Sequence, residues 1–275
     1  MAQELALGVM TQFHQPPREA LEAVRALDIP TVQVGYPGQL DSADGVAAIQ
    51  DASAQTGVEI TTVFCGYAGE SYADIPTVQA TVGLVPPSTR AARLDMTHRI
   101  ADFARRLGVA RVAAHIGFVP EDAADPAYRD IVETIQGLCD RLAGQGQVFA
   151  LETGQETARG LRQFIGDVGR PNLRVNFDPA NMILYGKDKP IPALDLLMPW
   201  IDGVHCKDGR WPTQPGQLGE ETPLGQGDVD LRRWLHRLIE LGYRGPLTIE
   251  REISGEQQRR DIAAGRDLIR SLIAE

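Results

Sequence analysis

The sequence predicts a single (β/α)8 barrel, and three observations lead to that fold class. The chain has 275 residues, close to the roughly 250 that are typical of one such barrel. A hydrophobic fraction of 43% allows a large buried core. Short apolar runs alternate with amphipathic segments along the whole chain, as consecutive strand–helix units require. We therefore expect one α/β domain over residues 1–275.

Eight candidate strands follow one another along the chain. Most are nearly continuous apolar runs, as expected for a parallel sheet that is covered on both faces. The dinucleotide-binding fingerprint GxGxxG does not follow the first of them, which weighs against an open doubly wound sheet. The expected strands are Leu5–Met10, Thr31–Gly35, Val58–Phe64, Ala110–Ile116, Gln147–Glu152, Leu173–Asp178, Ile201–Cys206 and Pro246–Glu250.

Start and stop signals predict helices between these strands. Pro16 and Pro17 open the first expected helix, and Ser88 is the candidate N-cap of a helix that ends at Gly108. Asp228 or Asp230 is the candidate cap of a later helix. The remaining signals predict a helix from Pro126 to Leu142, a stop at Gly242 for the helix after Asp230, and a last helix from about Gly255 to Ala274.

Two connections, residues 66–87 and 207–227, are much longer than the others. Both follow predicted strands, so in a barrel both lie at the carboxyl face, where barrel enzymes carry their active sites. Long loops at such a place are usually functional. We expect both to be active-site loops.

Composition excludes several classes of protein. The net charge of −10 and the pI of about 5.0 argue against nucleic acid as a partner, since binding phosphates requires clustered Lys and Arg. No apolar run is long enough for a membrane span, and the first residues do not resemble a secretory signal. The three widely spaced cysteines indicate neither disulfides nor a CxxC site. These features predict a cytoplasmic protein.

Four chemically active residues stand at or near the ends of four successive predicted strands: Glu152, Asp178, His205 and Glu250. A single acidic residue at a strand end is usually solvated or a helix cap, but a barrel gathers all four ends around one mouth. Ending apolar strands in carboxylates costs desolvation energy unless a cation compensates. Three carboxylates and one imidazole favour one divalent ion, Mn²⁺ first, with Mg²⁺, Co²⁺ or Zn²⁺ as alternatives.

Other polar residues flank these four. His115 ends the fourth predicted strand, Glu156 and Asn181 follow the fifth and sixth, and Lys207 and Arg210 follow the seventh. Their donors and acceptors suit a small sugar or polyol, so we expect them to bind substrate. For Lys207 and Arg210, a solvated loop is an equally weighted alternative.

Five strings, LETGQET, NFDPANM, VHCKDG, GQGDVD and LTIERE, together resemble the sugar phosphate isomerase/epimerase family of xylose isomerase-like TIM barrels. The resemblance covers nearly the whole chain. It implies a metal held by the four strand-end residues, with Glu152 and Glu250 also acting as the acid–base pair. The implied reaction is isomerisation or epimerisation of a ketose or related sugar through proton abstraction and an enediolate. Family members commonly form homodimers or homotetramers, and the sequence favours neither.

Several departures keep other functions open. Ketose 3-epimerases of this group carry a substrate-binding His three residues after the metal-binding Asp, where this chain has Asn181. Glu156 and Arg210 are also offset from the family positions. A metal-dependent lyase or dehydratase of inosose, dehydroshikimate or keto-sugar type is therefore the alternative, followed by a catalytically silent sugar-binding barrel. The three-zinc apurinic endonucleases are disfavoured, because only five histidines are present.

Whether the substrate is phosphorylated stays open in the sequence. The turn from Gly225 to Asp228 precedes a predicted helix, and glycine-rich turns at helix N-termini can bind phosphate. Asp228 opposes an anion there, so a tight turn is the preferred interpretation.

Overall fold

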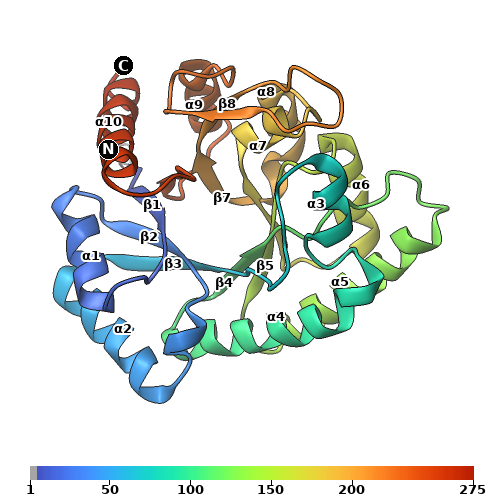
Figure 1. Ribbon diagram of the computed structural model, residues 1–275, viewed down its shortest axis with the longest axis horizontal. Helices are drawn as coiled ribbons and strands as arrows, with labels where there is room; N and C mark the ends of the chain where they lie inside the picture. The colour runs from blue at the N-terminus through green and yellow to red at the C-terminus, as the bar shows by residue number, and fades with distance from the viewer. Residues whose placement is uncertain (1–4) are drawn as a thin grey trace.

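The computed structural model describes residues 5–275 and forms a closed barrel of eight parallel strands surrounded by helices (Figure 1). Around the barrel the strands follow the order β1-β10-β7-β6-β5-β4-β3-β2. The predicted fold class is confirmed, and the expected strand ends agree to within one or two residues. The barrel strands are β1 Leu7–Thr11, β2 Thr31–Gly35, β3 Glu59–Phe64, β4 Arg111–Ala114, β5 Val148–Glu152, β6 Leu173–Phe177, β7 Ile201–Cys206 and β10 Leu247–Ile249.

The helices that surround the barrel bury an apolar face against it, whereas Val78 of the helix in the first long connection packs with Val82 and Tyr185 outside the main core. In α9, for example, Trp234, Leu235 and Leu238 are fully buried, and the Trp234 ring stacks on Phe177 of β6 at 6.4 Å between centroids. The helices are α1 Pro17–Ala26, α2 Ala43–Thr56, α3 Ile75–Thr81, α4 Pro87–Leu107, α5 Pro126–Ala143, α6 Ala158–Val168, α7 Pro179–Leu184, α8 Pro190–Leu197, α9 Leu231–Glu240 and α10 Glu256–Ile273, with single 3-10 turns at Gly38–Leu40 and Met198–Trp200.

Two predicted helix caps differ from the structure. Ser88 is not an N-cap: α4 starts at Pro87, two residues earlier than that cap predicts, with Pro86 in the capping position. Proline is favoured at the first helical position because its backbone angle is preset for a helix. Asp230 does occupy the N-cap of α9, but its backbone is left-handed (φ 55°) and its side chain makes no capping hydrogen bond. Asp228 lies outside that cap and accepts a hydrogen bond from the Trp211 amide (3.2 Å).

The two long connections are partly ordered into secondary structure, and they meet. Residues 66–87 contain α3, and residues 207–227 contain a short antiparallel pair, β8 Asp208–Arg210 and β9 Glu220–Thr222. The Ile75 amide of the first connection donates a hydrogen bond to the Gly216 carbonyl of the second (3.2 Å). Both connections contribute residues to the main cavity at the carboxyl ends of the strands.

No helix between residues 5 and 275 combines the length and the hydropathy needed to cross a bilayer.

Candidate metal centre

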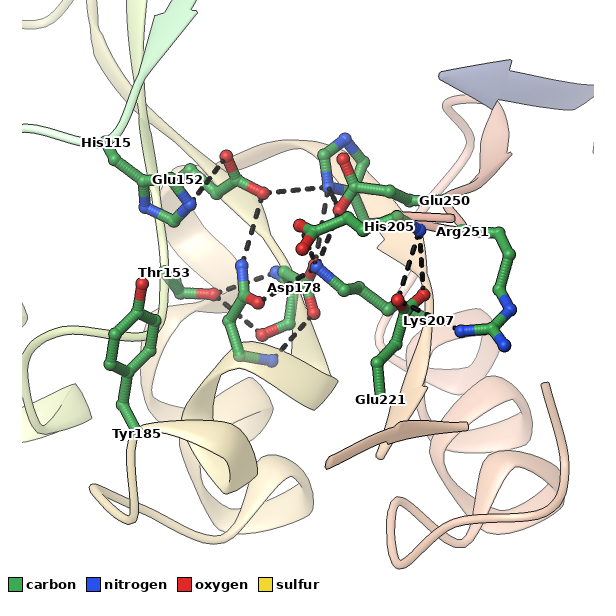
Figure 2. Close-up of polar contacts among 12 residues, drawn as sticks. His115, Glu152, Thr153, Asp178, Tyr185, His205, Lys207, Glu221, Glu250 and Arg251 are labelled. Carbon is green, nitrogen blue, oxygen red and sulfur yellow. Dashed lines mark hydrogen bonds and ion pairs between the residues drawn. The ribbon is translucent and has the colours of Figure 1, made fainter. Parts of the chain in front are cut away.

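Four side chains from neighbouring strands converge at the carboxyl face of the barrel (Figure 2). Glu152 is the last residue of β5, Asp178 follows β6, His205 lies in β7 and Glu250 follows β10. One ligand atom from each lies within 4.8 Å of the others. The structure thus brings together all four residues that the strand ends predicted, and such a cluster could hold a divalent ion.

The centre of this cluster is the Nδ1 atom of His205. Glu152 Oε1 lies 2.9 Å from it, Glu250 Oε2 lies 3.1 Å away and Asp178 Oδ2 lies 3.4 Å away. His205 is completely buried. Three carboxylate oxygens and one ring nitrogen therefore face the same point inside the protein, which is the hard, oxygen-rich donor set of a divalent-cation site.

Gln33 supports the assignment of Nδ1 as a ligand atom. Its Oε1 lies 2.9 Å from the other ring nitrogen of His205, Nε2. The Gln33 amide nitrogen donates to Asn176 Oδ1 (3.3 Å), which turns the Gln33 oxygen toward the ring. An Nε2–H donor to Gln33 leaves a lone pair on Nδ1 in neutral histidine, the usual second-layer arrangement around a metal-binding imidazole.

Two atoms of the cluster have unmet bonding capacity. His205 Nδ1 and Asp178 Oδ2 are buried and make no hydrogen bond of acceptable geometry. Buried polar atoms without partners are rare in native proteins and require an explanation. A cation at the shared point would satisfy both atoms, so these residues fit the divalent ion that the sequence predicted.

The pKa shifts within the cluster also favour a positive charge at its centre. Burial alone lowers the pKa of His205, but Glu250 and Glu152 outweigh it and raise the pKa well above its usual value. Burial raises the pKa of Asp178, against the opposing effect of Lys207. For Glu250, the positive His205 and Lys207 overcome burial and hold the pKa well below normal. The carboxylates therefore require positive charge at their centre, which a proton or a cation can supply.

Lys207 is bound on all sides within the protein. It is fully buried, and its Nζ donates to Asn181 Oδ1 (3.1 Å), Glu250 Oε2 (3.0 Å) and Glu252 Oε1. An ammonium has three protons to donate, and all three are used. Burial opposes its charge, but Glu250 and Glu252 raise its pKa well above normal. Lys207 is thus held against the carboxylates.

Asn181 and His115 hold the other edge of the cluster. The Asn181 side-chain amide donates to Glu152 Oε1 (3.3 Å), and its backbone amide donates to Asp178 Oδ1 (2.9 Å). His115 Nε2 lies 3.1 Å from Glu152 Oε2. These contacts fix both oxygens of Glu152, one toward the shared point and one toward the ring of His115.

A cavity of about 490 Å³ opens in front of the cluster. Of the four clustered residues, only Glu152 and Glu250 line it; Asp178 and His205 lie behind them, fully buried. The walls combine the carboxylates with aromatic and aliphatic side chains. Its lining residues are Met10, Gln12, Gly35, Tyr36, Phe64, Cys65, Gly66, Tyr72, His115, Glu152, Asn181, Leu184, Tyr185, Leu218, Gly219, Glu221, Glu250 and Glu252.

Three of the residues expected to bind substrate do not line the cavity: Glu156, Lys207 and Arg210. Lys207 is buried among the carboxylates described above, and the other two lie elsewhere. Glu156 is buried, accepts a weak hydrogen bond from the Val119 amide (3.4 Å), and has its pKa raised to about 7 by burial. Arg210 is exposed on β8, where its guanidinium donates to the Gln226 carbonyl (3.4 Å). Neither side chain is part of the cavity lining.

Several residues near the centre were not predicted from the sequence. Gln33 could have been identified most easily from the sequence. It lies inside the apolar run TVQVG of a buried strand, where a glutamine is costly unless it is hydrogen-bonded. Glu252 stands within the string LTIERE but carried no separate signal. Glu221 lies in a long connection, and only the β8–β9 pairing brings it to the cavity.

A closed parallel barrel with this polar cluster at its carboxyl face places the chain in the class of TIM-barrel proteins. Within that class the chain belongs to the family of xylose isomerase-like TIM barrels, whose model matches residues 21–272. The resemblance inferred from the five strings is thereby confirmed. A solved xylose isomerase domain protein from Planctomyces limnophilus is 43% identical to this chain, with a TM-score of 0.93 and 98% of each chain covered.

Curated relatives of this chain include two epimerases. A 2-epi-5-epi-valiolone 7-phosphate 2-epimerase from an Actinoplanes species is 37% identical over 94 residues, 34% of this chain and 33% of that protein. The L-ribulose-5-phosphate 3-epimerase UlaE of Salmonella typhi is 24% identical over 238 residues, 83% of this chain and 77% of that protein. The match spans about a third of the length of the first curated relatives. The chain is therefore similar to enzymes of the sugar epimerase and isomerase kind.

Proposed function

We propose that this protein is a divalent-metal-dependent epimerase of a ketose or a closely related polyol ketone. The observation that carries the proposal is that two residues of the cluster line the cavity and the other two do not. Glu152 and Glu250 both face His205 Nδ1 and line the cavity, whereas Asp178 and His205 are shielded from it. Of the four clustered residues, therefore, only the two glutamates can reach a bound substrate, and an epimerase needs two groups that move protons.

The strand order supports this pairing. Glu152 ends β5 and Glu250 follows β10, and β6 and β7 separate these strands in the barrel wall. The two carboxyl groups thus approach the cavity from different directions. A carbon held between them can lose its proton to one glutamate and receive a proton from the other on its opposite face.

One divalent ion held by Glu152, Asp178, His205 and Glu250 would polarise the substrate carbonyl and stabilise the enediolate that forms when the proton leaves. The donor set favours Mn²⁺ or Mg²⁺. His115 fixes the outer oxygen of Glu152, and Lys207 fixes an oxygen of Glu250. These contacts hold each carboxylate in a defined orientation, which proton transfer requires. The aromatic walls can pack against the C–H face of a sugar while limiting its contact with water.

Isotope exchange tests the proposed reaction. The Mn²⁺-loaded protein is incubated in D₂O with a panel of ketoses, and products are identified by mass spectrometry and NMR. Epimerisation places one deuterium at the inverted carbon without a change of composition. Loss of water or of an aglycone would instead support the metal-dependent lyase or dehydratase. A protein that binds no Mn²⁺ even at excess metal would favour a silent sugar-binding barrel.

Substitution of the two glutamates tests their roles. Glu152→Gln and Glu250→Gln should each lower kcat by about 10²–10⁴-fold, the usual contribution of a positioned acid or base. Circular dichroism should show an unchanged fold, and Glu220→Gln is the matched control, because Glu220 is exposed on β9 and does not line the cavity. Near-normal turnover in both variants would refute the acid–base assignment.

A further inference from the structure

We infer that the cavity is built for a neutral, unphosphorylated sugar or polyol ketone and discriminates against sugar phosphates. This inference rests on the proposed function and narrows its substrate class. The two similar epimerases described above are named for phosphorylated substrates, so the inferred substrate class of this protein differs from theirs. Three features of the structure carry the inference: the charges that line the cavity, the pairing of the nearby cations, and the filling of the glycine-rich turn.

The charged groups facing the cavity are acidic. Glu152, Glu221, Glu250 and Glu252 all line it, and within residues 5–275 no lysine or arginine does. A divalent ion and the Lys207 ammonium together balance the three carboxylates of the cluster. Glu252 then stays uncompensated, and Arg251 is shared between Glu221 and Asp261, so the groups around the cavity keep an excess of negative charge. Like charges at close range in a partly desolvated cavity repel strongly, so a phosphate dianion entering here would meet repulsion.

The cations nearest to the cavity are already engaged. Lys207 donates all three of its protons to Asn181, Glu250 and Glu252. Arg251 is paired with Glu221 at 3.0 Å and with Asp261 at 2.8 Å (its contact with Glu221 is drawn in Figure 2). A phosphate could recruit either cation only by displacing a carboxylate that the protein itself supplies.

The glycine-rich turn before α9 is filled from within. In TIM barrels, phosphate groups frequently bind to the loops that follow the seventh and eighth strands, and here that region contains the string GQGDVD. The amides of Gly225 and Gly227 point at one oxygen of Asp208, at 2.9 and 3.0 Å. The amides of Gly209 and Val229 point at its other oxygen, at 2.9 and 3.2 Å.

Such a group of converging amides is a typical anion-binding site. Asp208 is buried, with 1% of its surface exposed, so its carboxylate permanently occupies the place that a substrate phosphate would take. A Cβ at Gly227 would lie only 2.2 Å from the Asp208 carboxylate oxygen, which leaves no room for a second anion beside it. The turn therefore serves to hold Asp208 and the β8–β9 pair.

One competing location for a phosphate is a neighbouring cavity of about 510 Å³. It shares Glu250 and Glu252 with the main cavity, and Arg259 lines it. Arg259 makes no ion pair with any described residue, so it is the cation to test. If a sugar phosphate binds well to this protein, Arg259 is the residue expected to hold it.

The experiment compares free ketoses with their terminal phosphate esters, for example D-fructose with D-fructose 6-phosphate, on the Mn²⁺-loaded protein. Affinity is measured by calorimetric titration and turnover by product analysis. We expect the free ketose to be favoured by at least about tenfold in both affinity and kcat/KM, which corresponds to ~1.4 kcal/mol. Glu252→Gln should reduce this preference severalfold, whereas the exposed Glu220→Gln should leave it unchanged.

Esters that bind as tightly as the free sugars would overturn the inference. Loss of that ester binding in Arg259→Gln would then locate the phosphate in the neighbouring cavity. A preference that stays the same in Glu252→Gln would also contradict the electrostatic argument. If neither the free ketoses nor their phosphate esters bind, both the proposed function and the inferred substrate class are refuted. Binding without epimerisation would refute the reaction alone, because the affinities still test the charge preference.

Discussion

Asp178 and Asp208 are both buried aspartates near the carboxyl face of the barrel, yet the protein treats their carboxylates in opposite ways. Each has no more than 1% of its surface exposed. Asp208 receives two backbone amides on each oxygen, so its hydrogen-bonding capacity is met within the chain. Asp178 receives one amide on Oδ1, from Asn181, and none on Oδ2.

The difference teaches how to separate a structural carboxylate from a functional one. Burial and residue type are equal in the two cases, so neither distinguishes them. What differs is whether the protein satisfies the group. An incompletely satisfied buried carboxylate that faces two further acids and a histidine costs stability unless a ligand compensates. Asp208 is thus a structural anchor, whereas Asp178 keeps a free carboxylate oxygen that the proposed cation would bind.

The largest expected effects come from neutralising these two residues. Asp178→Asn should lower Mn²⁺ affinity by more than about 100-fold. That exceeds the 10–100-fold loss typical when a residue that only hydrogen-bonds to a metal ligand is substituted. Asp178→Asn should cost the metal-free protein little stability, because it removes one of three mutually repelling carboxylates. Asp208→Asn should leave metal affinity nearly unchanged but lower the free energy of unfolding by about 2–4 kcal/mol, because an amide NH₂ then faces backbone donors.

Calorimetric metal titration and urea unfolding in the presence of a chelator measure both quantities. The proposed difference between a structural Asp208 and a metal-binding Asp178 is contradicted if Asp178→Asn destabilises the metal-free protein as much as Asp208→Asn does. It is also contradicted if the two variants lose metal affinity equally.

Gln33 provides a smaller effect on the same centre. Gln33→Met keeps the side-chain volume but removes the acceptor for His205 Nε2. We expect a 10–100-fold loss of Mn²⁺ affinity, as for other residues that hydrogen-bond to a metal-binding histidine. Gln50→Met is the control, since Gln50 is exposed and donates to the Arg106 carbonyl. Equal affinities of the two variants for Mn²⁺ would show that Gln33 does not orient the histidine.

Glu156 should make stability depend on pH. Burial raises its pKa from 4.5 to about 7, so folding favours its protonated form. Its contribution to stability is complete below pH 4.5 and is lost as the pH rises through about 7, amounting to at most about 3 kcal/mol by pH 8. In Glu156→Gln this loss should disappear. Unfolding curves at pH 5 and pH 8 measure it, and an identical pH dependence in both proteins would contradict the assignment.

Arg210 should have the smallest effect of all. It is exposed, lies outside the cavity lining, and makes one long contact with a backbone carbonyl. We expect Arg210→Ala to change kcat/KM by less than about twofold, in the range of an ordinary surface substitution. A loss of tenfold or more would mean that Arg210 reaches the substrate when ligand is bound.

Most of the fold could be predicted because its signals are local. Apolar runs such as VFALE and LRVNFD define strands by themselves, and eight strand–helix units are long enough to close a barrel. The cap at Ser88 was wrong because the neighbouring Pro87 competes for the helix start. The β8–β9 pair was not predicted, because three-residue strands carry almost no pattern.

The convergence of the cluster followed from position alone, since strand ends in a barrel share one mouth. The roles of the surrounding residues did not follow. Lys207 and Arg210 are three positions apart and looked equivalent in sequence, yet one is buried among carboxylates and the other is exposed. Position along the chain determines which strand a residue follows, but side-chain direction and burial decide what it touches.

By itself the sequence determined the barrel, the family and the four residues Glu152, Asp178, His205 and Glu250, because strand periodicity and strand-end chemistry are written in consecutive residues. Only the tertiary structure decided which of those residues face the cavity, that Gln33 supports His205, and that Asp208 fills the glycine-rich turn. These depend on contacts between segments far apart in the chain, whose geometry is fixed only when the barrel closes.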